Sequence, residues 1–326
     1  MRTASHDVFG EPQDVLHLAE TPTPEPGKGQ VLIRMILSPI HNHDIWTVRG
    51  SYGYKPSLPG AVGGSEAVGT VEAVGEGVDS ALIGKRVTAA GVHGAWAEFF
   101  LAPAAGLVPV PDAISDEAAA QLIAMPFSAM ALLEFLGVKP NQWVIQNTAN
   151  GAVGKAVAML AQARGIHVIN LVRRDEGVKE LEELGIKNAV STAQNNWRET
   201  VRTLTGEQPI KAGVDSIGGS ASKDIVELLG EDGLLVSFGS MTGEPMQIPS
   251  GPVIFKQLTI KGFWGSTVIG TMEPDTRRRL IGELIQHVAS GTIVLPVEGV
   301  YGLADISQAV KASLASGKSG KVLLKP

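Results

Sequence analysis

The stretch from Trp143 to Gly165, WVIQNTANGAVGKAVAMLAQARG, most constrains the fold that this chain can adopt. It opens with a short apolar run typical of a buried parallel strand, and residues 151–163 then carry small and apolar side chains at helical spacing. Gly151 and Gly154 lie at the turn, where glycine lets backbone approach a ligand and lets a helix pack closely on a strand. The free N–H groups at the start of such a helix attract a pyrophosphate. The stretch therefore predicts a dinucleotide site.

This glycine pattern is incomplete, because TANGAVG lacks the first glycine of G-x-G-x-x-G. An ordinary glycine-rich turn between a strand and a helix remains an alternative. The next predicted strand, residues 168–172, ends in Arg173 and Arg174, about 20 positions after the turn. An acidic residue there would contact the ribose of NAD, whereas arginine can grip the extra phosphate of NADP. The pair favours NADP(H), with a solvated arginine pair neutralised by Asp175 as the alternative.

Composition limits the class of protein. A chain of 326 residues with 44% hydrophobic and 18% charged residues is long enough for two domains, each with its own core. The formal net charge of −6 gives no general attraction for nucleic acid or anionic lipid. We expect a globular protein that binds neither nucleic acid nor membrane.

The chain contains no cysteine, which excludes disulfides, thiol catalysis and thiolate-rich zinc sites. Its first residues, MRTASHDVFGEP, lack the basic start and apolar core of a secretory signal. The longest apolar segment, residues 118–137, is interrupted by polar side chains and by Pro126, so it predicts buried helices and no membrane span. These features predict a cytoplasmic protein.

Two patterns of predicted secondary structure follow one another along the chain. Up to Pro111, short strands with glycine at the bends predict a small antiparallel barrel. Helices then alternate with apolar strands, as in a doubly wound parallel sheet, before the last 50 or so residues return to the first style. We expect a first domain of residues 1–120 with 267–326, and a second of residues 121–266. The predicted strands are residues 15–18, 31–37, one within 60–77, 86–89, 95–101, 143–146, 168–172, 214–217, 234–238, 258–263, 297–300 and 321–324, and the main predicted helices are 151–163, 179–184, 221–229, 276–289 and 306–314.

Several motifs resemble a known superfamily, in order and over nearly the whole length. They are PEPGKGQVLIR, GGSEAVGTVEAVG, TANGAVG, VDSIGG and GKVLLKP, and together they resemble the medium-chain dehydrogenases/reductases. Within that superfamily, SPIHNHDIWTVRGSYG, INLVRR and KGFWGS look most like the mitochondrial-type trans-2-enoyl thioester reductases, a zinc-free branch close to the quinone oxidoreductases. The resemblance implies an α/β fold: a doubly wound Rossmann sheet, a GroES-like β-barrel catalytic domain, and a homodimer.

Zinc-dependent members of that superfamily hold their catalytic metal with cysteine and histidine. This chain has no cysteine, and Ser65 stands before Glu66 where their ligand histidine would be, so we expect no metal. The alternative is a site from His41, His43, Asp44 and Glu66, with the two histidines on one face of an extended segment. Without a Lewis acid, alcohol oxidation lacks its usual means of stabilising an alkoxide.

A metal-free hydride site can reduce a double bond that is conjugated to a carbonyl, with one acid to protonate the α carbon. Tyr52 matches the tyrosine of the reductases' G-x-Y-G segment, and the resemblance implies that it is this acid or that it orients the thioester. A tyrosine that packs its ring at a turn is the alternative, and Tyr54 is a rival.

Further site residues come from strand ends and from the resemblance. Gly239, Ser240 and Met241 follow a predicted strand, at the carboxyl edge where doubly wound sheets bind ligands. Phe263 and Trp264 resemble an aromatic pair that borders the nicotinamide and acyl pocket, although core or dimer packing explains such a pair equally well. The complete set of predicted cofactor contacts is Asp44, Asn147, Gly151, Ala152, Val153, Arg173, Arg174, Gly239, Ser240, Met241 and Gly265.

Two departures from the reductase pattern bear on the substrate. The family commonly has Asn-Pro-x-Asp where this chain has His41, Asn42, His43 and Asp44, and Gly60 is an apparent insertion near Tyr52. The first hypothesis is an NADPH-dependent reductase of enoyl-CoA or enoyl-acyl carrier protein. A quinone or alkenal reductase, for which Tyr52 is dispensable, is the second. A cofactor-binding protein kept for structural or RNA-binding use is the third, and the acidic charge balance disfavours RNA.

Overall fold

The computed structural model describes the whole chain, residues 1–326. The chain divides into two compact units, Met1–Ala124 with Val294–Pro326, and Met125–Ile293. Residues 267–293, which the sequence predicts in the first domain, lie in the second unit. The reason is that Arg164, at the end of one helix of the second unit, pairs with Glu283 at 2.9 Å and so fastens the helix Pro274–Ala289 there. No helix is both long and apolar enough to cross a membrane.

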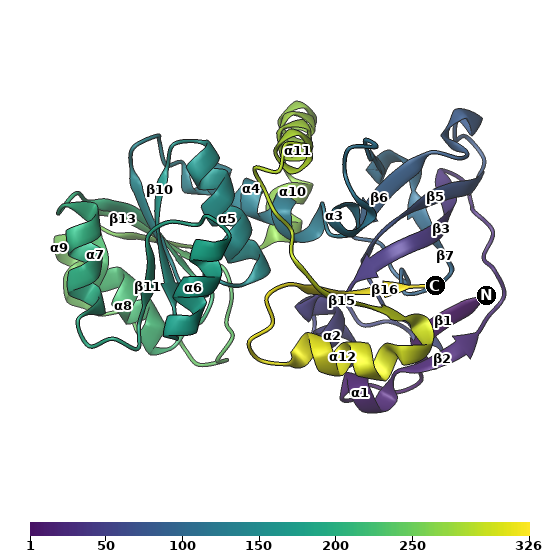
Figure 1. The fold of residues 1–326 in the computed structure, drawn as a ribbon, viewed down its shortest axis with the longest axis horizontal. Coiled ribbons are helices and arrows are strands. Elements are labelled where there is room, and N and C mark those ends of the chain that lie inside the picture. The colour runs from purple at the N-terminus through teal and green to yellow at the C-terminus, as the bar shows by residue number, and fades with distance from the viewer. The chain divides into compact units, whose positions relative to one another are not determined.

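The first unit is built on two mainly antiparallel sheets (Figure 1). A seven-stranded sheet has the order β15-β16-β3-β5-β6-β8, with β7 also paired to β3, and a three-stranded sheet has the order β2-β1-β4. Only β15 and β16 run parallel. The strands are β1 (Arg2–His6), β2 (His17–Glu20), β3 (Gln30–Pro39), β4 (Ala61–Val62), β5 (Glu66–Val74), β6 (Arg86–Ala90), β7 (Phe99–Pro103), β8 (Val108–Pro109), β15 (Val297–Gly302) and β16 (Lys321–Lys325), and the helices are α1 (Pro12–Val15), α2 (Asn42–Val48), α3 (Asp116–Ala120) and α12 (Ile306–Leu314).

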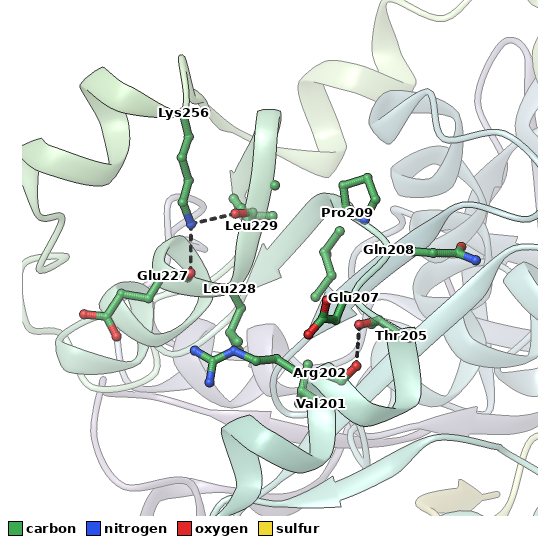
Figure 2. Close-up of a pocket in the computed structure, with 12 residues that line it drawn as sticks. Val201, Arg202, Thr205, Glu207, Gln208, Pro209, Glu227, Leu228, Leu229 and Lys256 are labelled. Atoms are coloured by element: carbon green, nitrogen blue, oxygen red, sulfur yellow. Dashed lines mark hydrogen bonds between the residues drawn. The ribbon is translucent and has the colours of Figure 1, made fainter.

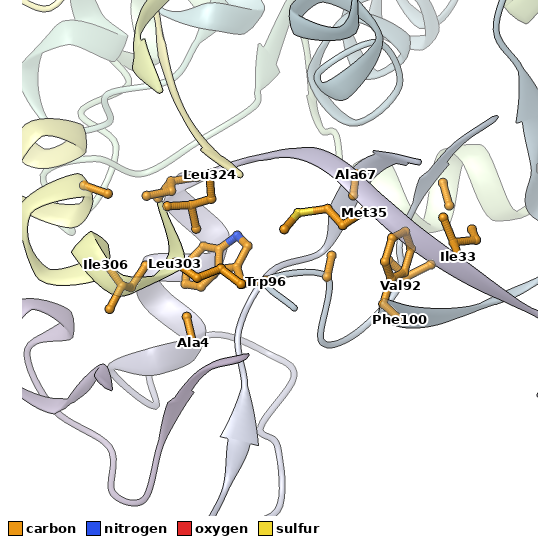
Figure 3. Packing of buried hydrophobic residues seen from close by; sticks show 14 of the residues in the cluster. Ala4, Ile33, Met35, Ala67, Val92, Trp96, Phe100, Leu303, Ile306 and Leu324 are labelled. Atoms are coloured by element: carbon orange, nitrogen blue, oxygen red, sulfur yellow. The ribbon is translucent and has the colours of Figure 1, made fainter. Parts of the chain in front are cut away.

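Trp96 lies at the centre of this unit's core and explains a glycine pair (Figure 3). Its side chain is fully buried, and its indole N–H donates to Pro39 O at 3.2 Å. A Cβ at Gly63 or Gly64 would lie 2.2 or 2.3 Å from the indole ring, so the GG of GGSEAVG makes room for it. Leu303 and Leu324 pack in the same cluster. The C-terminal segment thus folds back onto the first unit, as its pattern of predicted strands indicated.

The second unit contains a six-stranded parallel sheet with the order β11-β10-β9-β12-β13-β14. Figure 1 shows α5 and α6 on one side of these strands, with α7, α8 and α9 on the other. This is a doubly wound sheet whose order reverses between β9 and β12, and it confirms the predicted fold class. The strands are β9 (Trp143–Gln146), β10 (His167–Val172), β11 (Ala189–Ser191), β12 (Ile210–Asp215), β13 (Leu229–Ser237) and β14 (Thr259–Gly262), and the helices are α4 (Ala124–Leu136), α5 (Ala152–Ala163), α6 (Asp175–Glu183), α7 (Trp197–Thr205), α8 (Ser220–Leu228), α9 (Ser250–Phe255), α10 (Gly265–Gly270) and α11 (Pro274–Ala289).

Two of the predicted strands begin too early. The predicted strand 95–101 starts only at Phe99, as β7. The predicted strand 15–18 starts only at His17, as β2, because Pro12 begins the short helix α1, which ends at Val15. Pro is favoured in the first turn of a helix, where its missing N–H is not needed. The first strand of the chain, β1, was not predicted at all.

Candidate functional site

The glycine turn of the second unit joins β9 to α5 in the expected way. Gly151 precedes α5 with an extended backbone and no side-chain cap, so the first N–H groups of the helix have no side-chain acceptor there. Gly154 lies within the first turn of α5, where an added Cβ would come within 2.7 Å of Thr148 O and of Ala149 Cα. Gly154 therefore allows the close approach of helix and strand, and Gly151 leaves the helix start open.

These two glycines should respond differently to alanine. Gly154→Ala is expected to destabilise the protein by about 1–3 kcal/mol, because backbone atoms meet the new methyl group. Gly151→Ala is the matched control, since its methyl group would meet only Thr148 O, at 3.2 Å. Thermal unfolding of both variants checks the difference. Equal melting temperatures would contradict the packing role of Gly154.

Asn147 joins the ends of the two central strands. Its Nδ2 donates to Asp215 Oδ1 at 2.7 Å, and its Oδ1 accepts from the backbone N–H of Ser216 at 2.8 Å. Asp215 is fully buried and also accepts from the Ser222 hydroxyl and from Ile217 N–H. The amide thus fastens β9 to β12 at the point where the sheet order reverses. The predicted contact between Asn147 and a cofactor stays a prediction.

Arg173 and Arg174 follow the end of β10 and are exposed, and neither forms an ion pair. The Asp175 carboxylate instead accepts from Gln194 Nε2 at 2.7 Å. Hydrogen bonds from Ser191 and Gln194 lower the pKa of Asp175, and neither arginine contributes to that shift. Asp175 therefore does not neutralise the arginine pair, and both guanidinium groups remain available to a phosphate.

The two residues of the predicted aromatic pair, Phe263 and Trp264, differ in their burial. Phe263 is buried and packs against the rings of Phe135 and Phe238, with centroids 5.4 and 5.5 Å away, whereas Trp264 is 68% exposed. Phe263 is thus a core residue, and Trp264 alone presents its ring to the surface.

Other predicted cofactor contacts lie near strand ends of the same unit. A Cβ at Gly239 would lie 2.9 Å from Ser216 O, so Gly239 packs its backbone close to the segment that follows β12. Ser240 and Met241 are exposed just beyond it, and Gly265 begins α10. Ala152 is exposed and Val153 is partly buried at the start of α5.

A buried polar cluster lies in the first unit. The side chains of His41 and Glu66 are fully buried, with His41 Nε2 and Glu66 Oε2 2.8 Å apart. Glu66 Oε1 accepts from the backbone N–H groups of Ile123 and Ala124 at 2.7 and 2.8 Å. Burial raises the pKa of Glu66 to about 7, against the opposing effect of these donors, and burial lowers the pKa of His41 well below its usual value. His41 is therefore neutral at physiological pH.

The raised pKa of Glu66 predicts how stability depends on pH. In the folded chain Glu66 keeps its proton up to about pH 7, whereas in the unfolded chain it releases the proton near the ordinary pKa of glutamate. The contribution of Glu66 to the free energy of unfolding therefore falls as pH rises from the ordinary pKa to the raised one. Glu66→Gln does not titrate. The free energy of unfolding of the wild type should therefore fall, relative to that of Glu66→Gln, by about 3 kcal/mol between pH 4.5 and pH 7. Chemical unfolding of both proteins across this range checks it, and parallel curves would contradict it.

Tyr52 lies beside this cluster, and its rival Tyr54 is held elsewhere. The ring of His43 lies 5.0 Å from that of His41 and 5.8 Å from that of Tyr52. Tyr54 is 40% exposed and stacks on His93 with centroids 3.9 Å apart. The two tyrosines therefore have different surroundings, and Tyr52 is the one next to His43.

Asp44 and Lys321 complete the surroundings of the cluster. Asp44 is buried and its Oδ2 accepts from the backbone N–H of His41 at 2.9 Å, at the start of α2. The predicted contact between Asp44 and a cofactor stays a prediction. Burial of its ammonium group lowers the pKa of Lys321 to about 8, and Lys321 Nζ lies 3.4 Å from Ile40 O. Nothing in the sequence marked Lys321, because it begins an ordinary apolar strand.

Comparisons with known proteins bear on this arrangement. Residues 27–112 match the family described as "Alcohol dehydrogenase GroES-like domain", and residues 152–282 match the family described as "Zinc-binding dehydrogenase". The chain is 33% identical over 301 residues to the mitochondrial enoyl-[acyl-carrier-protein] reductase of Caenorhabditis elegans, covering 90% of this chain and 86% of that protein. The chain belongs to the medium-chain dehydrogenase/reductase superfamily. It is an oxidoreductase of that superfamily, as its motifs predicted.

Solved structures of similar proteins agree. A mycobacterial quinone oxidoreductase superposes with a TM-score of 0.88 at 28% identity, with all of both chains covered. A mycobacterial protein solved in complex with NADPH superposes with a TM-score of 0.87 at 29% identity, again with all of both chains covered. The GroES-like and Rossmann architecture implied by the resemblance is confirmed.

The residues weighed as a metal site do not form one in this medium-chain reductase. No three histidine, aspartate or glutamate side chains are arranged to hold a metal ion. The sequence placed His41 and His43 on one face of an extended segment, but α2 begins at Asn42, and the two imidazole rings stack. His41 and Glu66 bind each other, with the remaining Glu66 oxygen taken by backbone donors.

A depression of about 400 Å³ lies in the second unit (Figure 2), and no residue of the glycine turn lines it. Its lining residues come from the end of α7, from the start of β12 at Ile210 and from the junction of α8 and β13. Lys256 Nζ donates to Glu227 O at 2.8 Å and to Leu229 O at 2.7 Å, so it caps the end of α8. The depression is at the amino edge of the sheet, whereas doubly wound sheets bind ligands at the carboxyl edge.

Proposed function

We propose that this medium-chain reductase uses NADPH to reduce the α,β double bond of a 2-enoyl thioester carried by coenzyme A or acyl carrier protein. The observation that carries the proposal is the position of Tyr52, whose ring lies 5.8 Å from that of His43, beside the buried pair of His41 and Glu66. The enoyl-[acyl-carrier-protein] reductases that the chain resembles over nearly its whole length support the substrate class.

The cofactor proposal rests on the second unit. Arg173 and Arg174 are exposed and unpaired just after β10, and the helix start at Gly151 is open. Two guanidinium groups suit the extra phosphate of NADP(H), and uncapped helix N–H groups suit a pyrophosphate. A mycobacterial structural relative was solved with NADPH, which supports this choice.

NADPH, when bound, supplies a hydride to the β carbon of the substrate. Negative charge then builds on the thioester oxygen, and the α carbon must receive a proton. Tyr52 donates that proton from its hydroxyl group, or donates a hydrogen bond that holds the thioester oxygen in place. The neutral imidazole of His41 and the buried Glu66 take no direct part, because their facing atoms are already bonded to each other.

The test compares three substrates. NADPH oxidation is followed in parallel with crotonyl-CoA, a quinone and an alkenal, and we expect kcat/KM for the thioester to exceed the others by about tenfold or more. If the thioester is inert while the quinone turns over, the proposed substrate class is wrong.

A quinone reductase is the second candidate function. The resemblance to a mycobacterial quinone oxidoreductase over the whole chain favours it. The replacement of Asn-Pro-x-Asp by His41-Asn42-His43-Asp44 departs from the enoyl reductase pattern. Under this alternative Tyr52 is dispensable, so the same three substrates separate the two candidates.

We also propose a homodimer that forms through β14. This strand is an edge of the sheet, and all four of its residues are exposed. Ile254, Phe255 and Ile260 nearby are 61%, 83% and 39% exposed, which is a large apolar surface for a monomer. Sedimentation equilibrium tests this proposal, and a monomer at micromolar concentration would contradict it.

A further inference from the structure

His43 is a polar group for which the proposed function has no use. It is the second residue of α2, in the segment that departs from the reductase pattern. His43 Nε2 lies 2.7 Å from the hydroxyl of Ser65 and 3.6 Å from Asp44 Oδ1, and the side chain is 24% exposed. The imidazole is therefore anchored at one edge by a hydrogen bond while its faces remain available for ring contacts.

The ring of His43 contacts two other rings. It stacks on His41 at 5.0 Å with an interplanar angle of 19°, and His41 is itself fixed by Glu66. It also meets Tyr52 at 5.8 Å with an angle of 31°. The contacts thus run from the buried Glu66 through His41 and His43 to Tyr52.

Tyr52 has one aromatic neighbour. It lies after α2 in an irregular segment, between Ser51 and Gly53, and His43 provides its only aromatic contact. The side chain is partly buried, and its hydroxyl has no hydrogen bond within the protein. Because a misplacement of about 1 Å in a reacting group can cost on the order of 100-fold in rate, the side chain that holds Tyr52 matters for its chemistry.

We propose that His43, anchored by Ser65, is a positioning residue that sets the direction of the Tyr52 side chain. This inference rests on the proposed function, in which the Tyr52 hydroxyl meets the substrate. His43 itself touches neither substrate nor cofactor in this scheme. Its effect passes through the ring contact with Tyr52.

A spectroscopic test does not depend on the substrate. The chain has only 3 tyrosines, so tyrosine labelled with carbon-13 at the ring ζ position gives three resonances, and Tyr52→Phe identifies one of them. We expect His43→Ala and Ser65→Ala each to shift or broaden the Tyr52 resonance. His93→Ala is the matched control, because it removes the ring that stacks on Tyr54. A Tyr52 resonance that stays unmoved in both His43→Ala and Ser65→Ala overturns the inference, whether or not the protein reduces thioesters.

A kinetic cycle tests the same inference through the reaction. His43→Ala should lower kcat for crotonyl-CoA by about tenfold or more, with KM for NADPH unchanged, and Ser65→Ala should lower it less. In the Tyr52→Phe background His43→Ala should change kcat by less than about twofold, since the two residues act as a unit. An equal loss in both backgrounds overturns the positioning role. A wild type that reduces only quinones overturns the proposed function instead, and the tyrosine resonances then decide the role of His43.

Discussion

Tyr52→Phe is expected to lower kcat for crotonyl-CoA by about 100- to 1000-fold, because it removes the hydroxyl that donates to the substrate while keeping the ring beside His43. The exchange removes no hydrogen bond within the protein, so the melting temperature should stay the same. NADPH affinity should also stay the same, since Tyr52 is not among the proposed cofactor contacts. Steady-state NADPH oxidation with crotonyl-CoA and with a quinone checks the prediction, and quinone reduction should change by less than about twofold.

Tyr54→Phe is the matched control for this experiment. Tyr54 lies two residues further on and stacks on His93, away from the histidines next to Tyr52. The same loss of one hydroxyl should leave thioester reduction nearly unchanged. If Tyr54→Phe is the inactive variant, the acid has been assigned to the wrong tyrosine. If neither variant loses activity, the proton comes from another group or from water.

The sequence predicted those elements whose buried side chains are apolar. The strand β9 has the predicted bounds, Trp143–Gln146, and the helix α12 has the predicted bounds, Ile306–Leu314. In both, burial follows an apolar pattern that can be read without the fold. By contrast β1 buries Thr3, Ser5 and His6, and the Thr3 and Ser5 hydroxyls bond each other at 2.8 Å. A strand whose buried face is polar gives no hydrophobic period to detect.

The site was predictable to the extent that its residues lie at the ends of recognisable strands. Gly154 and the exposed Arg173 lie where the βα pattern placed them, since the geometry of a doubly wound sheet fixes these positions. The pairing of His41 with Glu66 could not be predicted as a hydrogen bond, because it joins residues on separate elements inside the first unit. The separation of Phe263 from Trp264 depends on Phe135, which the sequence does not place next to them.

Arg173→Ala should weaken NADPH binding by about 10- to 100-fold, because hydrogen bonds to a charged group contribute about 1.5–3 kcal/mol. NADH binding should hardly change, since NADH lacks the extra phosphate. The effect on NADPH should shrink at high salt, where charge attraction between exposed groups is screened. Fluorescence titration of both coenzymes at two salt concentrations checks this. Arg202→Ala is the matched control, because Arg202 belongs to the same unit but lines the depression at the opposite edge of the sheet.

The comparison of the two coenzymes decides what the arginine does. Equal weakening of NADPH and NADH would mean that Arg173 contacts a part that both share, and the NADP assignment would be wrong. Weakening of NADPH alone would assign the extra phosphate to Arg173. It would also show that Asp175, held by Gln194, leaves the charge of Arg173 free to act on a ligand.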